Sequence, residues 1–232
     1  MQFEQQTTKF IVKNLDSFLG GGMAANGERK KHGPLFPNSI RCIVSGPSNC
    51  GKTNLIFQLL FDPNGINFEN IYVFSKSLYQ PKYKMLQKVL PKEIGYFPFD
   101  DNTSVIKPSE AKPNSVIIFD DIACEKHDNI RNFFTMGRHS NVDIFYLGQT
   151  YSYIPKQLIR DNSNLLILFK QDDMNLNHIY RDHVNTDMTF SKFKELCTNA
   201  WGDKFGFVVI DKECELKNGR YRVGFDRFLK VL

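Results

Sequence analysis

The sequence predicts an α/β protein whose central sheet is mostly parallel and carries helices on both faces. From Ile40 onward, short aliphatic and β-branched runs alternate with longer amphipathic stretches, the pattern of strands and crossover helices. These runs are almost continuously apolar, as expected of strands that are buried on both faces. A chain of 232 residues that is 41% apolar can bury a substantial core, as one large domain or two small ones.

Five strands and their covering helices can be placed in order along the chain. Strands are predicted at residues 41–45, 71–75, 116–119, 143–147 and 165–169. Helices are predicted at residues 54–60, 80–90, 127–137, 174–182 and 191–200. After them, residues 205–211 and 220–225 are predicted to form a hairpin around Asn218 and Gly219.

The first strand leads into residues 46–53, Gly-Pro-Ser-Asn-Cys-Gly-Lys-Thr, which fit the phosphate-loop pattern G-x-x-x-x-G-K-[ST]. The glycines let backbone N–H groups turn inward, and the helix that follows adds its positive end to the anion site. We expect Lys52 to reach the β- and γ-phosphates of ATP and Thr53 to offer its hydroxyl to Mg²⁺. The predicted nucleotide-binding residues are Gly46, Pro47, Ser48, Asn49, Cys50, Gly51, Lys52, Thr53 and Asn54.

The chain before this strand differs in composition. Residues 1–35 include a glycine-rich segment at 20–27 and are predicted to form a flexible amino-terminal arm, in which residues 7–12 fit a short strand. Residues 36–232 are predicted to form one phosphate-loop ATPase domain that ends in the helices and the hairpin.

Two adjacent carboxylates, Asp120 and Asp121, follow the apolar run at 115–119. They are expected at the carboxyl edge of the sheet, where ligands bind in open α/β folds. In this interpretation Asp120 holds the Mg²⁺ together with Thr53, and Asp121 orients or deprotonates the water that attacks the γ-phosphate. The alternative is that the two residues cap the helix that begins near Lys126.

A polar amide, Gln149, follows the strand at 143–147, which we expect to lie beside the strand that ends at Asp120. There it can sense the γ-phosphate, although a glutamine that simply ends a strand fits the pattern too. Ring-forming motors also need an arginine from a neighbouring subunit to stabilise the transition state. Arg138 and Arg160 are the two candidates, and an ordinary surface or helix-capping role is open for each.

Composition narrows the class of protein. The longest aliphatic stretch, residues 165–169, is far shorter than the roughly 18 residues of a membrane span, and the first residues are unlike a signal peptide, so we expect a soluble intracellular protein. Five cysteines without C-x-x-C spacing favour reduced packing thiols over disulfides or zinc. A net charge of +5 suits a polyanionic partner but is weak support for one.

Several segments together resemble the FtsK/HerA superfamily. They are the phosphate loop, Ile-Phe-Asp-Asp at 118–121, Gly-Arg-His-Ser-Asn-Val-Asp at 137–143, Gly-Gln-Thr-Tyr at 148–151 and Leu-Ile-Arg-Asp-Asn at 158–162. Within that superfamily, residues 30–228 are similar to the genome-packaging ATPases of poxviruses and giant viruses and most closely to those of Polinton/Maverick-type elements and adintoviruses.

The resemblance implies a RecA-like P-loop NTPase that forms a homo-oligomeric ring, a hexamer or a pentamer. It implies Mg²⁺-dependent ATP hydrolysis that drives double-stranded DNA into a preformed capsid, with viral capsid proteins as partners. The implied location is the host cytoplasm or nucleus at sites of virion assembly, or the virion itself. It makes Arg138 the trans-acting arginine, whereas Asp121 departs from the glutamate usual at its position in cellular relatives.

Three other functions fit parts of the pattern. One is a DNA helicase or partitioning pump, which shares the same chemistry. The second is a small-molecule phosphotransferase, and the third is a scaffold protein that binds ATP without appreciable turnover.

Overall fold

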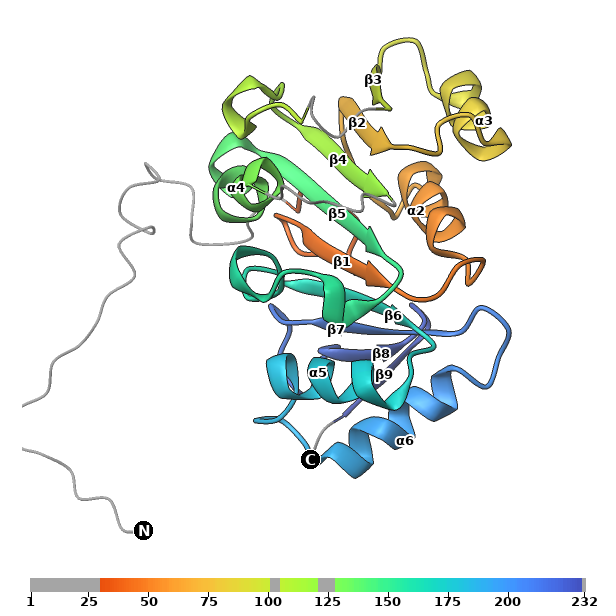
Figure 1. The fold of residues 1–232 in the computed structure, drawn as a ribbon, viewed down its shortest axis with the longest axis vertical. Coiled ribbons are helices and arrows are strands. Elements are labelled where there is room, and N and C mark those ends of the chain that lie inside the picture. The colour runs from red at the N-terminus through yellow and green to blue at the C-terminus, as the bar shows by residue number, and fades with distance from the viewer. Residues whose placement is uncertain (1–29, 101–104, 121–127, 231–232) are drawn as a thin grey trace, which may run out of the picture. The chain divides into compact units, whose positions relative to one another are not determined.

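The computed structural model describes residues 30–100, 105–120 and 128–230, and from Lys31 onward they belong to one compact unit. These residues form a nine-stranded sheet of order β3-β2-β4-β5-β1-β6-β7-β8-β9 (Figure 1). Most of the predicted arm, residues 1–29, lies outside the described residues, as does the strand expected at 7–12. The division of the chain at residue 35 therefore stays a prediction.

Six strands of the sheet are parallel and confirm the predicted fold class. They are β1 (Arg41–Ser45), β2 (Asn70–Ser75), β3 (Gly95–Phe99), β4 (Ser115–Asp120), β5 (Val142–Gly148) and β6 (Leu165–Phe169). Three antiparallel strands extend the sheet beyond β6, namely β7 (Phe207–Asp211), β8 (Tyr221–Val223) and β9 (Arg227–Leu229). The pairing of β7 with β8 confirms the predicted hairpin.

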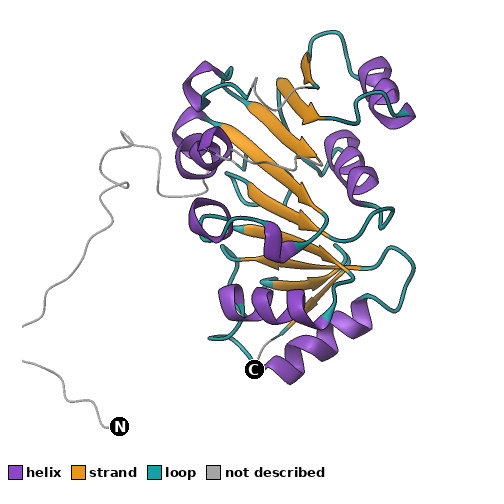
Figure 2. Cartoon of the chain, in the orientation of Figure 1, coloured by secondary structure: helices purple, strands orange, loops and turns teal. Residues whose placement is uncertain are grey.

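Helices cover both faces of the sheet, as Figure 2 shows. The helices are α2 (Lys52–Phe61), α3 (Pro81–Val89), α4 (Asp128–Met136), α5 (Asp173–His183) and α6 (Phe190–Ala200). Side chains of α2 and α3 share one apolar core with one face of the strands. Side chains of α4, α5 and α6 share a second core with the other face. In β1, Ile43 belongs to one core and Cys42 and Val44 to the other, as the two-residue period of a strand requires.

The position of β5 decides what lies beside the phosphate loop. β5 pairs in parallel with β1 on one side and with β4 on the other. It therefore separates the strand that leads into the phosphate loop from the strand that ends in Asp120. Since all three strands are parallel, their carboxyl ends meet at one edge of the sheet. The prediction that Gln149 follows a strand beside that of Asp120 is confirmed.

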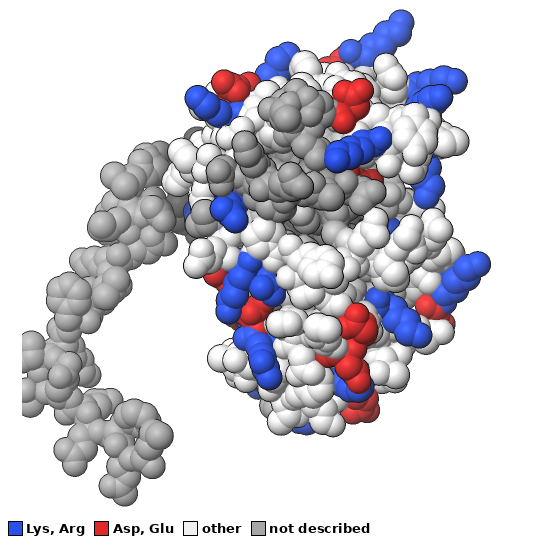
Figure 3. All heavy atoms as spheres, viewed as in Figure 1, with Lys and Arg blue, Asp and Glu red and all other residues white. Residues whose placement is uncertain are grey.

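Two strands, β3 and β9, escaped prediction. β3 contains Gly95 and Pro98, residue types that are depleted in strands, and it lies at the edge of the sheet, where a proline is tolerated. The structure also begins β7 at Phe207, so that Phe205, expected in the strand, lies in the turn before it. Among the described residues, no helix is long and apolar enough to cross a membrane. On the face drawn in Figure 3, basic and acidic side chains are interspersed.

Candidate functional site

The phosphate loop turns sharply between β1 and α2. Asn49 and Gly51 have left-handed backbone angles, with φ of 61° and 108°. A Cβ on Gly46 would lie 2.6 Å from the Cβ of Phe169 and 2.8 Å from the Cys50 sulfur, so only glycine fits there. The Gly46 N–H donates to the carbonyl of Gly148 at 3.1 Å and so ties the loop to the end of β5. These constraints explain the two glycines of the sequence pattern.

Lys52 begins α2 and reaches back over the loop. Its Nζ donates to the carbonyl oxygens of Gly46 and Pro47, at 2.6 and 2.9 Å. The ammonium is thus held at the loop mouth by neutral acceptors. Phosphate oxygens carry charge and accept stronger hydrogen bonds from an ammonium than carbonyls do. The arrangement therefore suits a lysine that exchanges these carbonyls for the phosphates of a nucleotide.

Thr53 and Asp120, the two predicted metal ligands, lie next to each other. The Thr53 hydroxyl donates to Asp120 Oδ2 at 3.4 Å, although 66 residues of chain separate them and they come from α2 and β4. Asp120 is 8% exposed at the end of its strand. Mg²⁺ takes oxygen ligands and is usually held by one or two carboxylates together with the phosphates of the substrate. A hydroxyl and a carboxylate beside a phosphate loop fit that ion.

Tyr83 of α3 is a partner of Asp120 that the sequence analysis missed. Its hydroxyl donates a hydrogen bond to Asp120 Oδ2, the oxygen that also accepts from Thr53. Burial, and then the negative charge of Asp120, raise the pKa of Tyr83 well above its usual value, so the hydroxyl stays protonated. The sequence pattern did place Tyr83 on the apolar face of its helix. The hydroxyl of a buried tyrosine needs a hydrogen-bond partner, and this requirement was the one hint in the sequence that Tyr83 would contact a polar residue.

A cleft at the carboxyl edge of the sheet brings most of the predicted residues together. It is lined by Ser48, Asn49, Gly51, Lys52, Thr53, Ser77, Gln80, Lys82, Asp120, Leu147 and Gln149. Gln149 thus shares one cleft with the phosphate loop and with Asp120, and its catalytic role stays a prediction. Ser77 and Gln80 come from the segment between β2 and α3, and Lys82 from the first turn of α3. None of the three was assigned a role from sequence. Asp121 lies outside the described residues, so its role as the base also stays a prediction.

The two candidate arginines differ in their surroundings. Arg160 is 8% exposed, and its Nη1 lies 2.7 Å from Asp182 Oδ2. Its guanidinium also lies over the ring of Tyr151, 5.0 Å from the centroid. Arg160 is therefore engaged inside its own subunit.

Arg138 is exposed and precedes β5, at the amino edge of the parallel strands. It lies near Arg41 of β1, whose pKa is lowered first by burial and also by the charge of Arg138. The phosphate loop lies at the opposite, carboxyl edge. Arg138 is therefore directed away from the nucleotide site of its own chain.

A protein-family model and solved structures resemble this chain. The family model described as poxvirus A32 protein matches residues 29–199. The structure of the genome-packaging NTPase B204 from Sulfolobus turreted icosahedral virus 2 with sulfate has a TM-score of 0.56 and 13% identity, over 81% of this chain and 96% of that one. The same protein with ATP-γS has a TM-score of 0.55 and 14% identity, over 85% and 100%. At these identities the likeness shows the fold.

A curated relative matches a shorter part of the chain. Chaperone protein ClpB from Clostridium tetani (strain Massachusetts / E88) is 34% identical over 95 residues, which is 40% of this chain. The match spans only 10% of the length of ClpB. The activity of ClpB therefore cannot be transferred to this chain.

Proposed function

Since the chain belongs to the family of the poxvirus A32 protein, we propose that it is an ATP-hydrolysing motor that packages duplex DNA into a viral capsid. The family and the fold shared with B204, a genome-packaging NTPase, support an ATPase role in packaging. The observation that supports hydrolysis most directly is the contact of Thr53 with Asp120 beside the phosphate loop. It joins the phosphate-binding and metal-binding halves of one site.

In the proposed reaction, the loop amides and Lys52 hold the phosphates while Thr53 and Asp120 hold Mg²⁺. When bound, Mg²⁺ would neutralise the charge that develops on the phosphate oxygens. Gln149 contacts the γ-phosphate from the end of β5, and Asp121 orients the attacking water. Tyr83 fixes the Asp120 carboxylate through its hydrogen bond and so keeps it aimed at the metal position. The products are ADP and inorganic phosphate.

The motor is proposed to be a homo-oligomeric ring, a hexamer or a pentamer, in which Arg138 enters the site of the next subunit. The exposed Arg138 at the edge opposite its own cleft suits this role, whereas the buried pair of Arg160 with Asp182 does not. DNA is held chiefly through its phosphates, so binding tolerates any sequence and weakens with salt. Capsid proteins are the further partners, at the site of virion assembly in the host cell.

The site is tested by measuring phosphate release from ATP. Lys52→Ala removes the ammonium from the loop and should lower turnover at least about a hundredfold, since a charged contact to the transferred phosphate is lost. Lys194→Ala is the matched control, because Lys194 lies on α6 in an exposed ion pair with Asp173. Unchanged turnover in Lys52→Ala would overturn the site.

The substrate is tested by adding duplex DNA to the same assay. The proposal expects duplex to stimulate hydrolysis while its strands stay paired. Strand separation would favour a helicase, and transfer of the γ-phosphate to a nucleoside monophosphate would favour a phosphotransferase. ATP binding without turnover, with or without DNA, would leave a scaffold role.

The role of Arg138 is tested by mixing subunits. Rings of wild-type chains doped with Arg138→Ala chains should lose activity more than in proportion to the mutant fraction, because each mutant disables a neighbour. Doping with Arg160→Lys, which keeps a positive charge beside Asp182, serves as the comparison. A loss strictly proportional to the Arg138→Ala fraction would contradict action in trans.

A further inference from the structure

A second hollow adjoins the phosphate loop on the side away from Asp120. It lies between the end of β6 and the turn that leads from α6 into β7, and its lining includes Cys50, Phe169, Trp201, Asp203 and Phe205. The polar cleft is lined by Asn49 and Gly51, and the second hollow by Cys50 between them, so neighbouring residues of the loop line the two hollows. No role has yet been assigned to this second hollow.

Phe205 is the most unusual residue of this hollow. Its side chain is 56% exposed, and its backbone has a φ of 67°, a left-handed angle that a bulky residue adopts only under strain. The ring nevertheless lies close to the phosphate loop, since a Cβ on Gly51 would be 3.5 Å from Phe205 Cδ1. An exposed aromatic ring in a strained conformation next to a ligand site points to a role in binding.

The turn that carries Phe205 is fixed at both ends. Trp201 Nε1 donates to the carbonyl of Leu168 in β6 at 2.9 Å, and the Gly206 N–H donates to the carbonyl of Asp203 at 3.0 Å. A Cβ on Gly206 would lie 1.9 Å from the carbonyl oxygen of Ala200, so the turn is packed tightly on the end of α6. The surrounding structure therefore holds the Phe205 ring in place.

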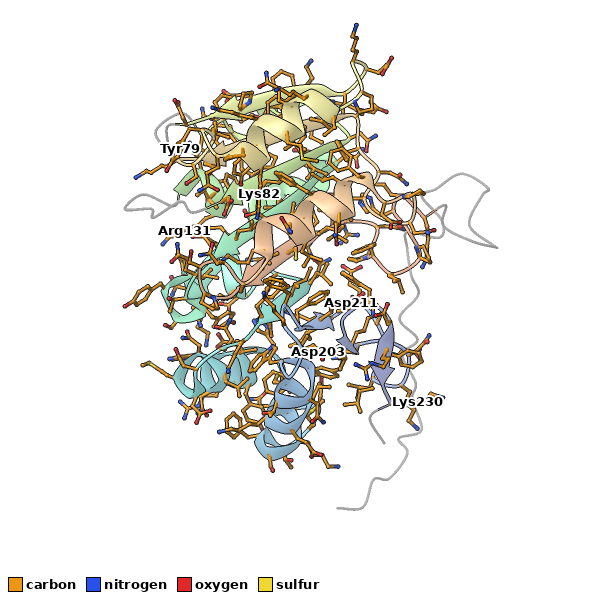
Figure 4. The ribbon with its side chains drawn as sticks, turned by 90° about the vertical axis from the view of Figure 1, so that its right-hand side faces the viewer. Tyr79, Lys82, Arg131, Asp203, Asp211 and Lys230 are labelled. Carbon is orange, nitrogen blue, oxygen red and sulfur yellow. The ribbon has the colours of Figure 1, made fainter. Side chains whose placement is uncertain are left out.

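The direction in which a nucleotide must lie follows from the polar cleft. Lys52, Thr53 and Gln149 line the cleft on the side of β5 and β4, and in the proposed reaction they hold the γ-phosphate end. The chain of phosphates then leads away from that side, and the sugar and base leave the loop toward β6 and β7. In Figure 4, Lys82 of the polar cleft lies above α2, and Asp203 of the second hollow lies below it.

We propose that the hollow between β6 and the α6–β7 turn binds the base of the nucleotide whose phosphates occupy the loop, with Phe205 as its stacking surface. The proposal rests on the proposed function, since it needs a nucleoside triphosphate in the loop. Aromatic rings stack on the flat faces of bases and gain affinity without hydrogen bonds to the base edge. The Lys204 ammonium, 5.1 Å from the Phe205 ring centroid, adds a cation–π contact that orients the ring.

The base contact can be separated from the phosphate contact by comparing two probes on the full chain. ATP reaches both hollows, whereas inorganic tripolyphosphate reaches only the loop. Phe205→Ala should weaken ATP binding about tenfold, within the range seen for loss of one base–aromatic stack, and should leave tripolyphosphate binding within about twofold. Isothermal titration calorimetry in the presence of Mg²⁺ measures both.

Two further variants guard against a mere loss of structure. Phe205→Gly suits the left-handed backbone and removes the ring, so it should weaken ATP binding as much as Phe205→Ala does. Phe205→Tyr keeps the ring and should bind ATP like the wild type. Phe228→Ala is the matched control, because Phe228 is 50% exposed but lies on β9.

The single tryptophan of the chain gives a second readout, because Trp201 lines the hollow. ATP should change its fluorescence emission, and tripolyphosphate at saturation should change it much less. The base subsite would be overturned if Phe205→Ala bound ATP as tightly as the wild type, or if it lost affinity for ATP and for tripolyphosphate equally. The proposed function would survive either result as long as binding still depended on Lys52. Wild-type chain that binds neither probe would overturn the proposed function and the subsite with it.

Discussion

The side of the phosphate loop that faces β5 and β4 carries hydroxyl, carboxylate, amide and ammonium groups, whereas the side that faces β6 and β7 adds aromatic rings to a few charged side chains. The strand order produces this difference, because β1 has β5 as one neighbour and β6 as the other. Stabilising the charge that develops on phosphate oxygens during hydrolysis needs fixed polar groups, and recognition of a flat base needs apolar surface. The comparison predicts that substitutions on the polar side lower turnover and substitutions on the aromatic side lower affinity.

The largest effect is expected from Asp120→Asn. The amide keeps the size of the side chain but loses the charge that would hold Mg²⁺ in the proposed site, so turnover should fall at least about a hundredfold. A steady-state ATPase assay over a range of Mg²⁺ concentrations measures this. Asp173→Asn removes a carboxylate from the exposed pair with Lys194 and should behave like the wild type. Full activity in Asp120→Asn would contradict a metal site at Asp120.

Gln149→Ala should give the next largest effect, a fall in kcat of about tenfold to a hundredfold with the Kd for ATP changed by less than about threefold. The reason is that a group which contacts the γ-phosphate acts chiefly in the transition state. The matched control is Gln171→Ala. Gln171 lies two residues beyond the end of β6, and its amide donates to the carbonyl of Phe169. Equal effects of the two changes would contradict the division between the two sides.

Tyr83→Phe should have a smaller effect of several fold. The variant keeps the ring in the core and removes the hydrogen bond to Asp120, so the carboxylate is less well oriented and a higher Mg²⁺ concentration is needed for half-maximal turnover. Tyr180→Phe, which removes a hydroxyl that donates to the Met188 carbonyl, is the control. An unchanged Mg²⁺ requirement in Tyr83→Phe would assign Tyr83 to packing alone.

The smallest effect on turnover is expected at the segment after Gln149, where the predicted change is in the pH dependence of stability. The Tyr151 hydroxyl oxygen lies 2.7 Å from His183 Nε2. Burial, and then the positive charge of Lys212, lower the pKa of His183 to about 3. The unfolded chain binds that proton near pH 6.5, so stability is fully present above this pH and is lost as pH falls toward 3.

Between pH 7 and pH 5, the wild type should lose roughly 2 kcal/mol of unfolding free energy through this histidine. His183→Gln should lose less over the same interval, as urea denaturation at both pH values can measure. Its turnover at pH 7 should stay near that of wild type. An identical pH dependence in both proteins would show that His183 is already solvated in the native state.

The sequence predicted the middle of the sheet well and led us to expect the phosphate loop, Asp120 and Gln149 at one edge of it, for physical reasons that particular residues show. The runs of β1, β4, β5 and β6 are buried on both faces and so read as continuous apolar segments. The phosphate loop, Asp120 and Gln149 each follow such a run directly. Their meeting in one cleft then follows from parallel pairing.

The sequence analysis missed residues whose roles depend on tertiary contacts or on backbone conformation. Tyr83 reads as one more apolar residue of an amphipathic helix, and only the structure shows its hydrogen bond to Asp120. Phe205 reads as the start of a strand, and only its backbone angle shows that it belongs to a turn. Arg160 and Arg138 look alike in sequence, and the partner of Arg160, Asp182, lies 22 residues further along the chain.

Strand β5 connects Arg138 at the amino edge of the sheet with Gln149 at the carboxyl edge, the two residues that would act in the proposed ring. All seven of its residues are buried, and Arg138 precedes it as Gln149 follows it. A strand of this length spans about 23 Å, and one clamped between two neighbours cannot shorten or bend easily. In the proposed ring, a displacement of Gln149 when the γ-phosphate departs would be transmitted along β5 to Arg138 of the same chain, which enters the site of the adjoining subunit. The order in which the subunits hydrolyse ATP would then depend on the stiffness of one buried strand.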